Sequence, residues 1–182
     1  MEALKNNRIN HYFIAPYKLR IYAFLIDYLV IIGYGILLVF LSFLLRSFFV
    51  PLFSKSPFTA ELIGFCLITL PVMLYFISME ASRKGGTLGK RKMNIRVVNS
   101  DGGKIGVARA LFRSIIKFIP WEISHFAVWN MVRPSHYSNA LIMSILLSVN
   151  ILAILYILFP LTNKHRKNIY DWITNTKVIR SE

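Results

Sequence analysis

The sequence has few of the cysteine and charged residues that soluble enzymes and metal-binding domains use. Its single cysteine, Cys66, excludes an internal disulfide and any multi-cysteine metal site. Charged residues make up only 16% of the 182 residues, whereas about 25% is typical of soluble domains, and 55% of the residues are apolar. So few charged groups leave a soluble fold of this size without enough polar surface. We therefore expect no enzyme activity, no cofactor and no metal site.

Acidic residues are especially scarce. The chain has 8 Asp and Glu against 22 Lys and Arg, which gives a net charge of +14. A chain that is both apolar and basic is typical of a protein at an anionic membrane surface, because a nucleic-acid binder displays its charge on a water-exposed scaffold. We therefore expect the lipid bilayer and anionic lipid headgroups as partners, and no nucleic acid. A cleavable signal peptide is not expected, because roughly 20 polar or mixed residues precede the first apolar run.

Three long apolar runs predict transmembrane helices at residues 21–45, 62–79 and 140–162. At about 1.5 Å per residue the first would span about 37 Å, more than the roughly 30 Å of the hydrocarbon core. Pro71 predicts a kink in the second helix, which membrane helices tolerate.

The segment between residues 106 and 132 has mixed character. Arg109, Arg113 and Lys117 are spaced four apart and lie on one helical face, with apolar residues on the other side. This pattern predicts an amphipathic helix in the membrane interface, with its basic side toward lipid phosphates. Residues 118–132 are short for a span and could be re-entrant, interfacial or a tilted helix.

The distribution of basic residues favours a span there. Lys and Arg are frequent in residues 1–20, in residues 80–117 and in the tail after Thr162, whereas the segment between the first two helices has few. The positive-inside rule assigns the three basic regions to the cytoplasm, which requires residues 118–132 to cross and leaves residues 133–139 outside. The alternative has three spans and an external tail.

The expected fold is an all-α integral membrane protein with a four-helix transmembrane bundle, an interfacial amphipathic helix and a small cytoplasmic sheet. Residues 94–99 alternate and are β-branched, a turn follows, and residues 104–105 could complete a hairpin. Residues 176–179 read as a third strand, because an isolated hairpin is marginal in water. No internal repeat is apparent. The chain then divides into a cytoplasmic segment 1–20, a membrane domain 21–162 with the insert 80–117, and a basic tail 163–182.

Asp27 is the one charged residue in the first predicted helix. A carboxylate at this depth is costly, so it normally faces a partner or a water-filled cavity. Arg20 lies seven residues earlier on the same face. Asp27 is therefore a candidate for helix packing, for proton or cation binding with Arg20 setting its charge, or for contact with a partner protein.

Glu122 and His125 lie three residues apart on one helical face. A Glu-x-x-His motif can bind a metal, but di-metal bundles need two copies and further Glu residues. A hydrogen-bonded polar pair inside the bundle, which could face Asp27, is favoured, and both residues are ion- or proton-binding candidates.

Residues 85–91 do not form a phosphate-binding P-loop, because the glycines are one residue too close and Arg91 stands where Ser or Thr is needed. Basic residues in the insert are instead expected to face lipid headgroups. They are Arg83, Lys84, Lys90, Lys92, Arg109, Arg113 and Lys117.

Several of these residues also carry a family resemblance. Arg20 and Asp27, the segment from Thr87 to Arg91, the residues from Ala108 to Arg113, and Asp171 make the chain resemble the RDD family of multi-pass membrane proteins, named for one Arg and two Asp. The resemblance covers roughly residues 16–180. The chain departs from the family near the second Asp, where Tyr170 precedes Asp171 in place of the usual His.

The resemblance implies two functions. One is a transporter or transport subunit that moves a proton or small cation through a site at Asp27, in a bacterial plasma membrane with both termini cytoplasmic. Four helices enclose little space, so we expect a homo-oligomer or a membrane partner protein. The alternative is a non-catalytic membrane adaptor that docks a partner or anionic lipid through its basic insert. In either case Asp171 is expected to dock against Arg91 or Arg96.

Overall fold

The structure is a computed structural model of the chain, and it describes residues 13–133 and 135–181. The chain forms two compact units. Of the described residues, the first unit comprises those up to Leu29, Tyr75–Ile116 and those from Tyr156 on, and the second comprises those within Val30–Leu74 and Lys117–Leu155. The long helices continue from one unit into the other, so each unit contains segments of several helices.

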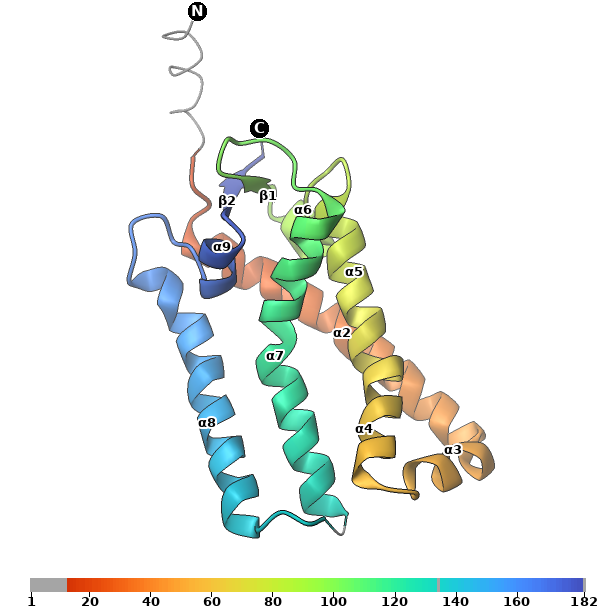
Figure 1. Cartoon of the computed structure of the whole chain (residues 1–182). Helices are drawn as coiled ribbons and strands as arrows, with labels where there is room; N and C mark the ends of the chain where they lie inside the picture. The colour runs from red at the N-terminus through yellow and green to blue at the C-terminus, as the bar shows by residue number, and fades with distance from the viewer. Residues whose placement is uncertain (1–12, 134, 182) are drawn as a thin grey trace, which may run out of the picture. The chain divides into compact units, whose positions relative to one another are not determined.

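The described elements are mostly helical (Figure 1). The long helices are α2 (Tyr17–Leu44), α4 (Pro57–Gly64) with its π-helical turn η1 (Phe65–Thr69) and continuation α5 (Leu70–Ala81), α7 (Val107–Val132), and α8 (Asn139–Leu158) with the 3-10 turn η2 (Phe159–Leu161). The short helices are α3 (Arg46–Phe53), α6 (Leu88–Lys92) and α9 (Ile169–Ile173), and the strands are β1 (Ile95–Asn99) and β2 (Thr176–Arg180).

Three helices of the described residues are long and apolar enough to cross a membrane: Tyr17–Leu44, Pro57–Ala81 and Asn139–Leu161. Their apolar side chains are widely exposed, as at Val39 (72%) and Leu147 (65%). Contiguous apolar surface on this scale suits lipid rather than water. The three apolar helices expected from the sequence are therefore present, and the chain is a membrane-type protein.

The second of these helices is irregular next to Pro71. Proline has no N–H to donate to the carbonyl four residues earlier, here that of Leu67, and its ring crowds that carbonyl. The helix has its π-helical turn immediately before Pro71, and the Tyr34 hydroxyl donates to the Leu67 carbonyl at 2.6 Å. A side chain of α2 thus replaces the donor that Pro71 lacks, as membrane helices require.

Two further prolines are compensated in the same way. Pro120 leaves the Ile116 carbonyl of α7 without its helical donor, and the Tyr156 hydroxyl donates to that carbonyl at 3.1 Å. Pro160 leaves the Tyr156 carbonyl unpaired at the end of α8, and the Asn168 side chain donates to it at 2.7 Å. These bonds attach α8 to α7, and α9 to the end of α8.

Helix α7 differs from the expectation in two ways. It is one continuous helix, whereas the sequence predicted an interfacial helix followed by a separate one at residues 118–132. Its predicted basic face is also divided near the start, because Arg109 is exposed whereas Arg113 is 1% exposed and the neighbouring Phe112 is 61% exposed. The prediction that Arg113 faces lipid headgroups is therefore wrong. Its acidic partners come from distant parts of the chain, which helical periodicity cannot reveal.

The sheet consists of β1 and β2, paired antiparallel with Val97 opposite Val178 (Figure 1). This confirms the predicted pairing of the insert with the tail. The predicted hairpin partner contributes only a single bridge, between Lys104 and Val98, and no third strand is present among the described residues. Only two residues separate Lys104 from the start of α7 at Val107, so a third strand has no room to develop.

An internal repeat underlies the sheet, although none is apparent in the sequence. Each strand follows a short helix and a left-handed asparagine, Asn94 (φ 52°) before β1 and Asn175 (φ 51°) before β2. Asparagine tolerates this conformation better than most residues. Each short helix begins at a polar N-cap, Thr87 for α6 and Asn168 for α9. The two copies share backbone roles rather than residue identities, so the sequence conceals them.

Candidate functional site

Asp27 lies on α2 in the first unit and is 3% exposed. Its carboxylate accepts three hydrogen bonds, from the Tyr75 hydroxyl at 2.8 Å, the Gly89 N–H at 2.8 Å and the Thr87 hydroxyl at 2.5 Å. All three partners donate, so both oxygens of the carboxylate act as hydrogen-bond acceptors. Asp27 therefore ties α2 to the first turn of α6.

The first turn of α6 explains why these residue types meet there. The first N–H groups of a helix have no acceptor within it. Asp27 takes one of them, the Tyr75 hydroxyl accepts the Leu88 N–H at 3.0 Å, and the Thr87 side chain accepts the Lys90 N–H at 3.4 Å. The polar residues of this region thus complete the hydrogen bonding of a short helix inside a largely apolar protein.

Gly89 is essential to this contact because α6 lies directly against α2. A Cβ atom at Gly89 would lie 2.0 Å from the Ala23 carbonyl oxygen and 3.0 Å from the carboxyl carbon of Asp27. The first obstacle is backbone, which cannot swing aside. Only glycine lets the Gly89 N–H approach Asp27.

A chain of buried ion pairs centres on Arg113 of α7. Arg113 contacts the Asp171 carboxylate, and its Nε lies 2.9 Å from the Glu80 carboxylate. Glu80 also pairs with Lys90, and the Asp171 carboxylate lies 3.6 Å from the Arg20 guanidinium. The five charges alternate in sign and join α2, α5, α6, α7 and α9. Each buried carboxylate thus has two cationic partners, which offsets the cost of burying it.

The ionisation of this cluster follows from its charges. Burial alone would lower the pKa of Arg113, but the Asp171 and Glu80 carboxylates raise it above its ordinary value. The Arg113 guanidinium lies over the Tyr170 ring at 4.7 Å, and burial together with Asp171 raises the pKa of Tyr170 to about 12. At neutral pH Arg113 is therefore charged and Tyr170 is neutral.

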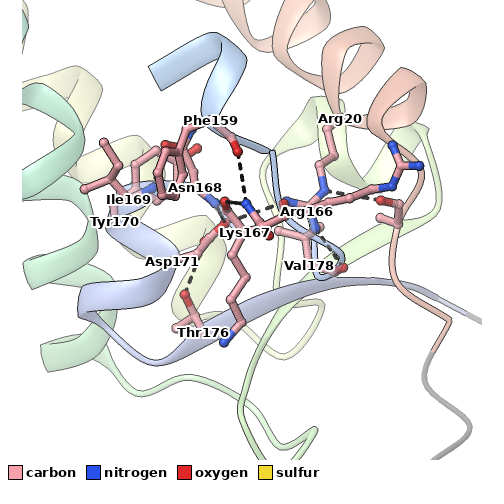
Figure 2. Close-up of polar contacts among 12 residues, drawn as sticks. Arg20, Phe159, Arg166, Lys167, Asn168, Ile169, Tyr170, Asp171, Thr176 and Val178 are labelled. Atoms are coloured by element: carbon pink, nitrogen blue, oxygen red, sulfur yellow. Dashed lines mark hydrogen bonds and ion pairs between the residues drawn. The ribbon is translucent and has the colours of Figure 1, made fainter. Parts of the chain in front are cut away.

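Arg20 was expected to set the charge of Asp27, but the two side chains have different partners. Its guanidinium donates to the carbonyls of Ala15 at 3.3 Å, Val178 at 3.2 Å, and Arg166 (Figure 2). These bonds attach α2 to β2 and to the loop before α9. Arg20 and Asp27 therefore belong to two separate polar contacts on the same helix.

Asp171 also has partners other than those expected. It contacts Arg113 and Arg20, whereas Arg91 donates to the Gly86 carbonyl at 2.7 Å and to the Ser82 hydroxyl at 2.8 Å. The prediction that Asp171 docks against Arg91 is therefore wrong. The other predicted partner, Arg96, lies on β1, and its Nε is buried without a hydrogen-bond partner among the described residues. Asp171 caps α9 through the Asn168 N–H at 3.0 Å, so it faces the start of its own helix.

The second unit contains a separate polar contact. The Thr69 hydroxyl donates to Glu122, and the His125 Nδ1 lies 3.6 Å from the same carboxylate oxygen. Thr69 is fully buried, whereas the side chains of Glu122 and His125 are 26% and 23% exposed. The Trp121 ring packs edge-on against His125, with centroids 4.9 Å apart. The sequence paired Glu122 with His125, but no local pattern pointed to Thr69.

The basic residues expected at lipid headgroups fall into two groups. Lys90 and Arg113 are paired with buried carboxylates and point inward. Lys117 is half-buried, and the exposed members of the set are Arg83, Lys84, Lys92 and Arg109. No group of three or more His, Cys, Asp or Glu that could hold a metal ion occurs among the described residues.

Comparison with known proteins gives one match. No curated protein and no solved structure matches the chain. The model of the RDD family matches residues 14–175, which include Arg20, Asp27 and Asp171. The match covers most of the chain and both polar contacts of the first unit. The chain therefore belongs to the RDD family.

Proposed function

We propose that this protein is a transporter or transport subunit in which Glu122 and His125 bind and release a proton within the membrane. The observation that carries the proposal is the hydrogen bond from Thr69 to Glu122. Thr69 is fully buried halfway along the candidate span Pro57–Ala81. In a bilayer crossed by that span, Thr69 and its partner Glu122 would lie near the middle. A carboxylate at that depth costs about 2.5–3.5 kcal/mol on insertion scales, and such residues commonly mark ion pathways.

The topology of the sheet supports four crossings. Strands β1 and β2 are paired, so both lie on one side of the membrane. Candidate span Asn139–Leu161 ends shortly before β2, which requires its start to lie on the other side. The chain must then cross between β1 and Asn139, and α7 is the long helix in that interval. Three crossings would put β1 and β2 on opposite sides, so their pairing favours four crossings.

Glu122 suits exchange better than Asp27 does. Both oxygens of Asp27 already accept hydrogen bonds, and its side chain is almost inaccessible. Glu122 has one hydroxyl donor and is partly exposed, so its carboxylate keeps acceptor capacity for a proton. We therefore assign Asp27 a structural role at the start of α6, and Glu122 the exchange role that the sequence suggested for Asp27.

The net charge of the Glu122–His125 pair explains how it would take up a proton. With His125 neutral and Glu122 ionised, the pair carries one negative charge, which a low-dielectric membrane disfavours. Uptake of one proton, held on either partner, makes the pair neutral overall. Glu61 of α4 is a second carboxylate that interacts electrostatically with Glu122. The pair can thus take up a proton from one side and release it where water or a cation stabilises the carboxylate. A complete pathway would be formed by a homo-oligomer or a membrane partner protein.

Proton flux into vesicles tests the proposal. The purified protein, reconstituted with a pH-sensitive dye inside the vesicles, should acidify the lumen under an imposed gradient. Glu122→Gln keeps the Thr69 hydrogen bond but cannot exchange a proton, so flux should drop to the protein-free background. Asp101→Asn makes the same chemical change at an exposed turn and should leave flux unchanged. Normal flux in a well-folded Glu122→Gln protein would contradict the assignment.

A second function is favoured by the charge distribution of the first unit. Its described acidic residues are Asp27, Glu80, Asp101 and Asp171, and all but Asp101 are buried. The exposed charge of this unit is therefore almost entirely positive, which suits a cytoplasmic adaptor surface for an acidic protein partner. The adaptor function would replace transport if wild-type protein carries no proton, Na⁺ or K⁺ flux and an acidic protein co-purifies with it stoichiometrically.

A further inference from the structure

The loop between η2 and α9 has a fixed backbone. The Asn163 side-chain amide donates to the carbonyls of Phe159 at 3.0 Å and Lys167 at 2.9 Å, and its oxygen accepts the Lys167 N–H at 2.8 Å (Figure 2). Arg20 donates to the Arg166 carbonyl. Arg166 adopts a φ of 48°, a conformation that residues other than glycine rarely take. These contacts all hold main-chain atoms, so they leave the basic side chains of the loop available.

The loop displays a compact group of cations next to an exposed apolar face of α9. Lys164, His165 and Arg166 are exposed, and the Lys167 ammonium lies 5.6 Å from the centre of the Trp172 ring. Trp172 is 54% exposed. Such a neighbourhood of cations and an indole is typical of the membrane–water interface, where Trp sits at headgroup level.

Helix α9 is oriented by its opposite side. Asp171 is 1% exposed and is held by Arg113, whereas Ile173, two residues later, is 64% exposed. Two residues of helix turn the chain by about 200°, so the buried ion pair forces Ile173 outward. The exposure of Trp172 and Ile173 therefore follows from the packing of α9.

The distance along the chain from the last candidate span indicates what covers the loop and the exposed face of α9. The candidate span Asn139–Leu161 ends three residues before Lys164, so the loop emerges at the edge of the hydrocarbon core. A positively charged, partly apolar surface at that depth complements a phosphate headgroup above and acyl chains below.

We propose that the α9 surface binds anionic phospholipids of the leaflet in which α8 ends. This surface consists of Lys164, His165, Arg166, Lys167, Trp172 and Ile173. The basic side chains contact the lipid phosphates, and Trp172 and Ile173 enter the interfacial region. The proposal does not depend on proton transport, because the α9 surface belongs to the first unit and includes neither Glu122 nor His125.

Fluorescence of Trp172 in lipid nanodiscs tests this proposal on the full chain. The chain has three tryptophans, so Trp121→Phe with Trp129→Phe leaves Trp172 as the one reporter. Two sets of nanodiscs contain phosphatidylglycerol and phosphatidylcholine at equal mole fraction. In one set the anionic lipid carries bromine, a quencher of tryptophan fluorescence, on its acyl chains, and in the other set the zwitterionic lipid carries it. Quenching should be stronger when the anionic lipid carries the bromine.

Two variants separate headgroup binding from simple insertion. Each basic residue near a charged surface contributes about 1 kcal/mol, or roughly a fivefold enrichment, so Lys164→Gln with Arg166→Gln should remove most of the preference for the brominated anionic lipid. Lys104→Gln with Arg180→Gln removes two exposed cations elsewhere and should preserve the preference. Absence of quenching by either lipid, as expected if water or a protein partner covers Trp172, would overturn the proposal. Equal quenching by both lipids, unchanged by the Gln substitutions, would do so as well.

Discussion

Replacement of Arg113 by Gln should unfold the first unit far more readily than any surface change. Arg113→Gln removes the cation shared by Asp171 and Glu80, whose side chains are 1% and 0% exposed. Breaking a buried ion pair by removing one partner costs about 3–5 kcal/mol, because the remaining charges stay buried. For a chain of this length that corresponds to a decrease in melting temperature of roughly 6–20 °C.

The same helix supplies the control for this prediction. Arg109 lies one turn before Arg113 and is exposed, so Arg109→Gln removes an equal charge and should change stability by no more than about 0.5 kcal/mol. Thermal unfolding of both variants and wild type in nanodiscs, followed by size-exclusion chromatography of the heated samples, gives the comparison.

The pH dependence of the Arg113→Gln defect tests its cause. Because the pKa of Arg113 is raised, the wild-type guanidinium stays charged throughout the accessible range. In the variant, Asp171 and Glu80 each keep one of their two cationic partners, so protonation of these buried carboxylates relieves an excess of negative charge, and the folded state gains more from this than the unfolded state. The difference in melting temperature between wild type and Arg113→Gln should therefore narrow as pH falls. Equal melting temperatures for the two Gln variants, or a gap that widens in acid, would refute the ion-pair account.

Three further predictions concern other parts of the chain. Gly89→Ala should disrupt the contact of α6 with the Ala23 carbonyl and lower the folded yield sharply, whereas Gly106→Ala, which has open space around it, should express normally. The pKa of Tyr170 is raised from 10.0 to about 12, so stability should be lost as pH rises from 10 to 12, and Tyr170→Phe should remove that loss in alkaline unfolding measurements. A cysteine at Ser135, in a Cys66→Ser background, should react with an impermeant reagent added outside intact cells, and labelling of the tail instead would favour three spans.

Local composition was enough to identify the membrane helices. The runs around residues 21–45, 62–79 and 140–162 are apolar along their whole length, and insertion into lipid depends on that summed property rather than on particular neighbours. The pairing of residues 94–98 with residues 176–179 was also predictable, because two short β-branched segments on one side of the membrane need a partner each.

The roles of single charged residues were less predictable. The spacing of Arg109, Arg113 and Lys117 suggested one basic stripe, yet Arg113 is buried and Arg109 is exposed. The difference arises from Asp171, which is far away in the sequence and supplies the opposite charge. A helical pattern records which residues share a face, but not which of them meets an opposite charge from a distant segment.

By itself the sequence determined that the chain is a basic membrane protein of the RDD family and that Arg20, Asp27 and Asp171 matter to it. Only the tertiary structure decided what each of them contacts: Asp27 completes the first turn of α6, and Arg20 and Asp171 join the ion pairs of Arg113. Hydrophobicity and charge count are sums over neighbouring residues, which a sequence displays directly. Hydrogen bonds and ion pairs depend on the approach of two particular atoms from distant segments, and only the folded chain fixes that approach.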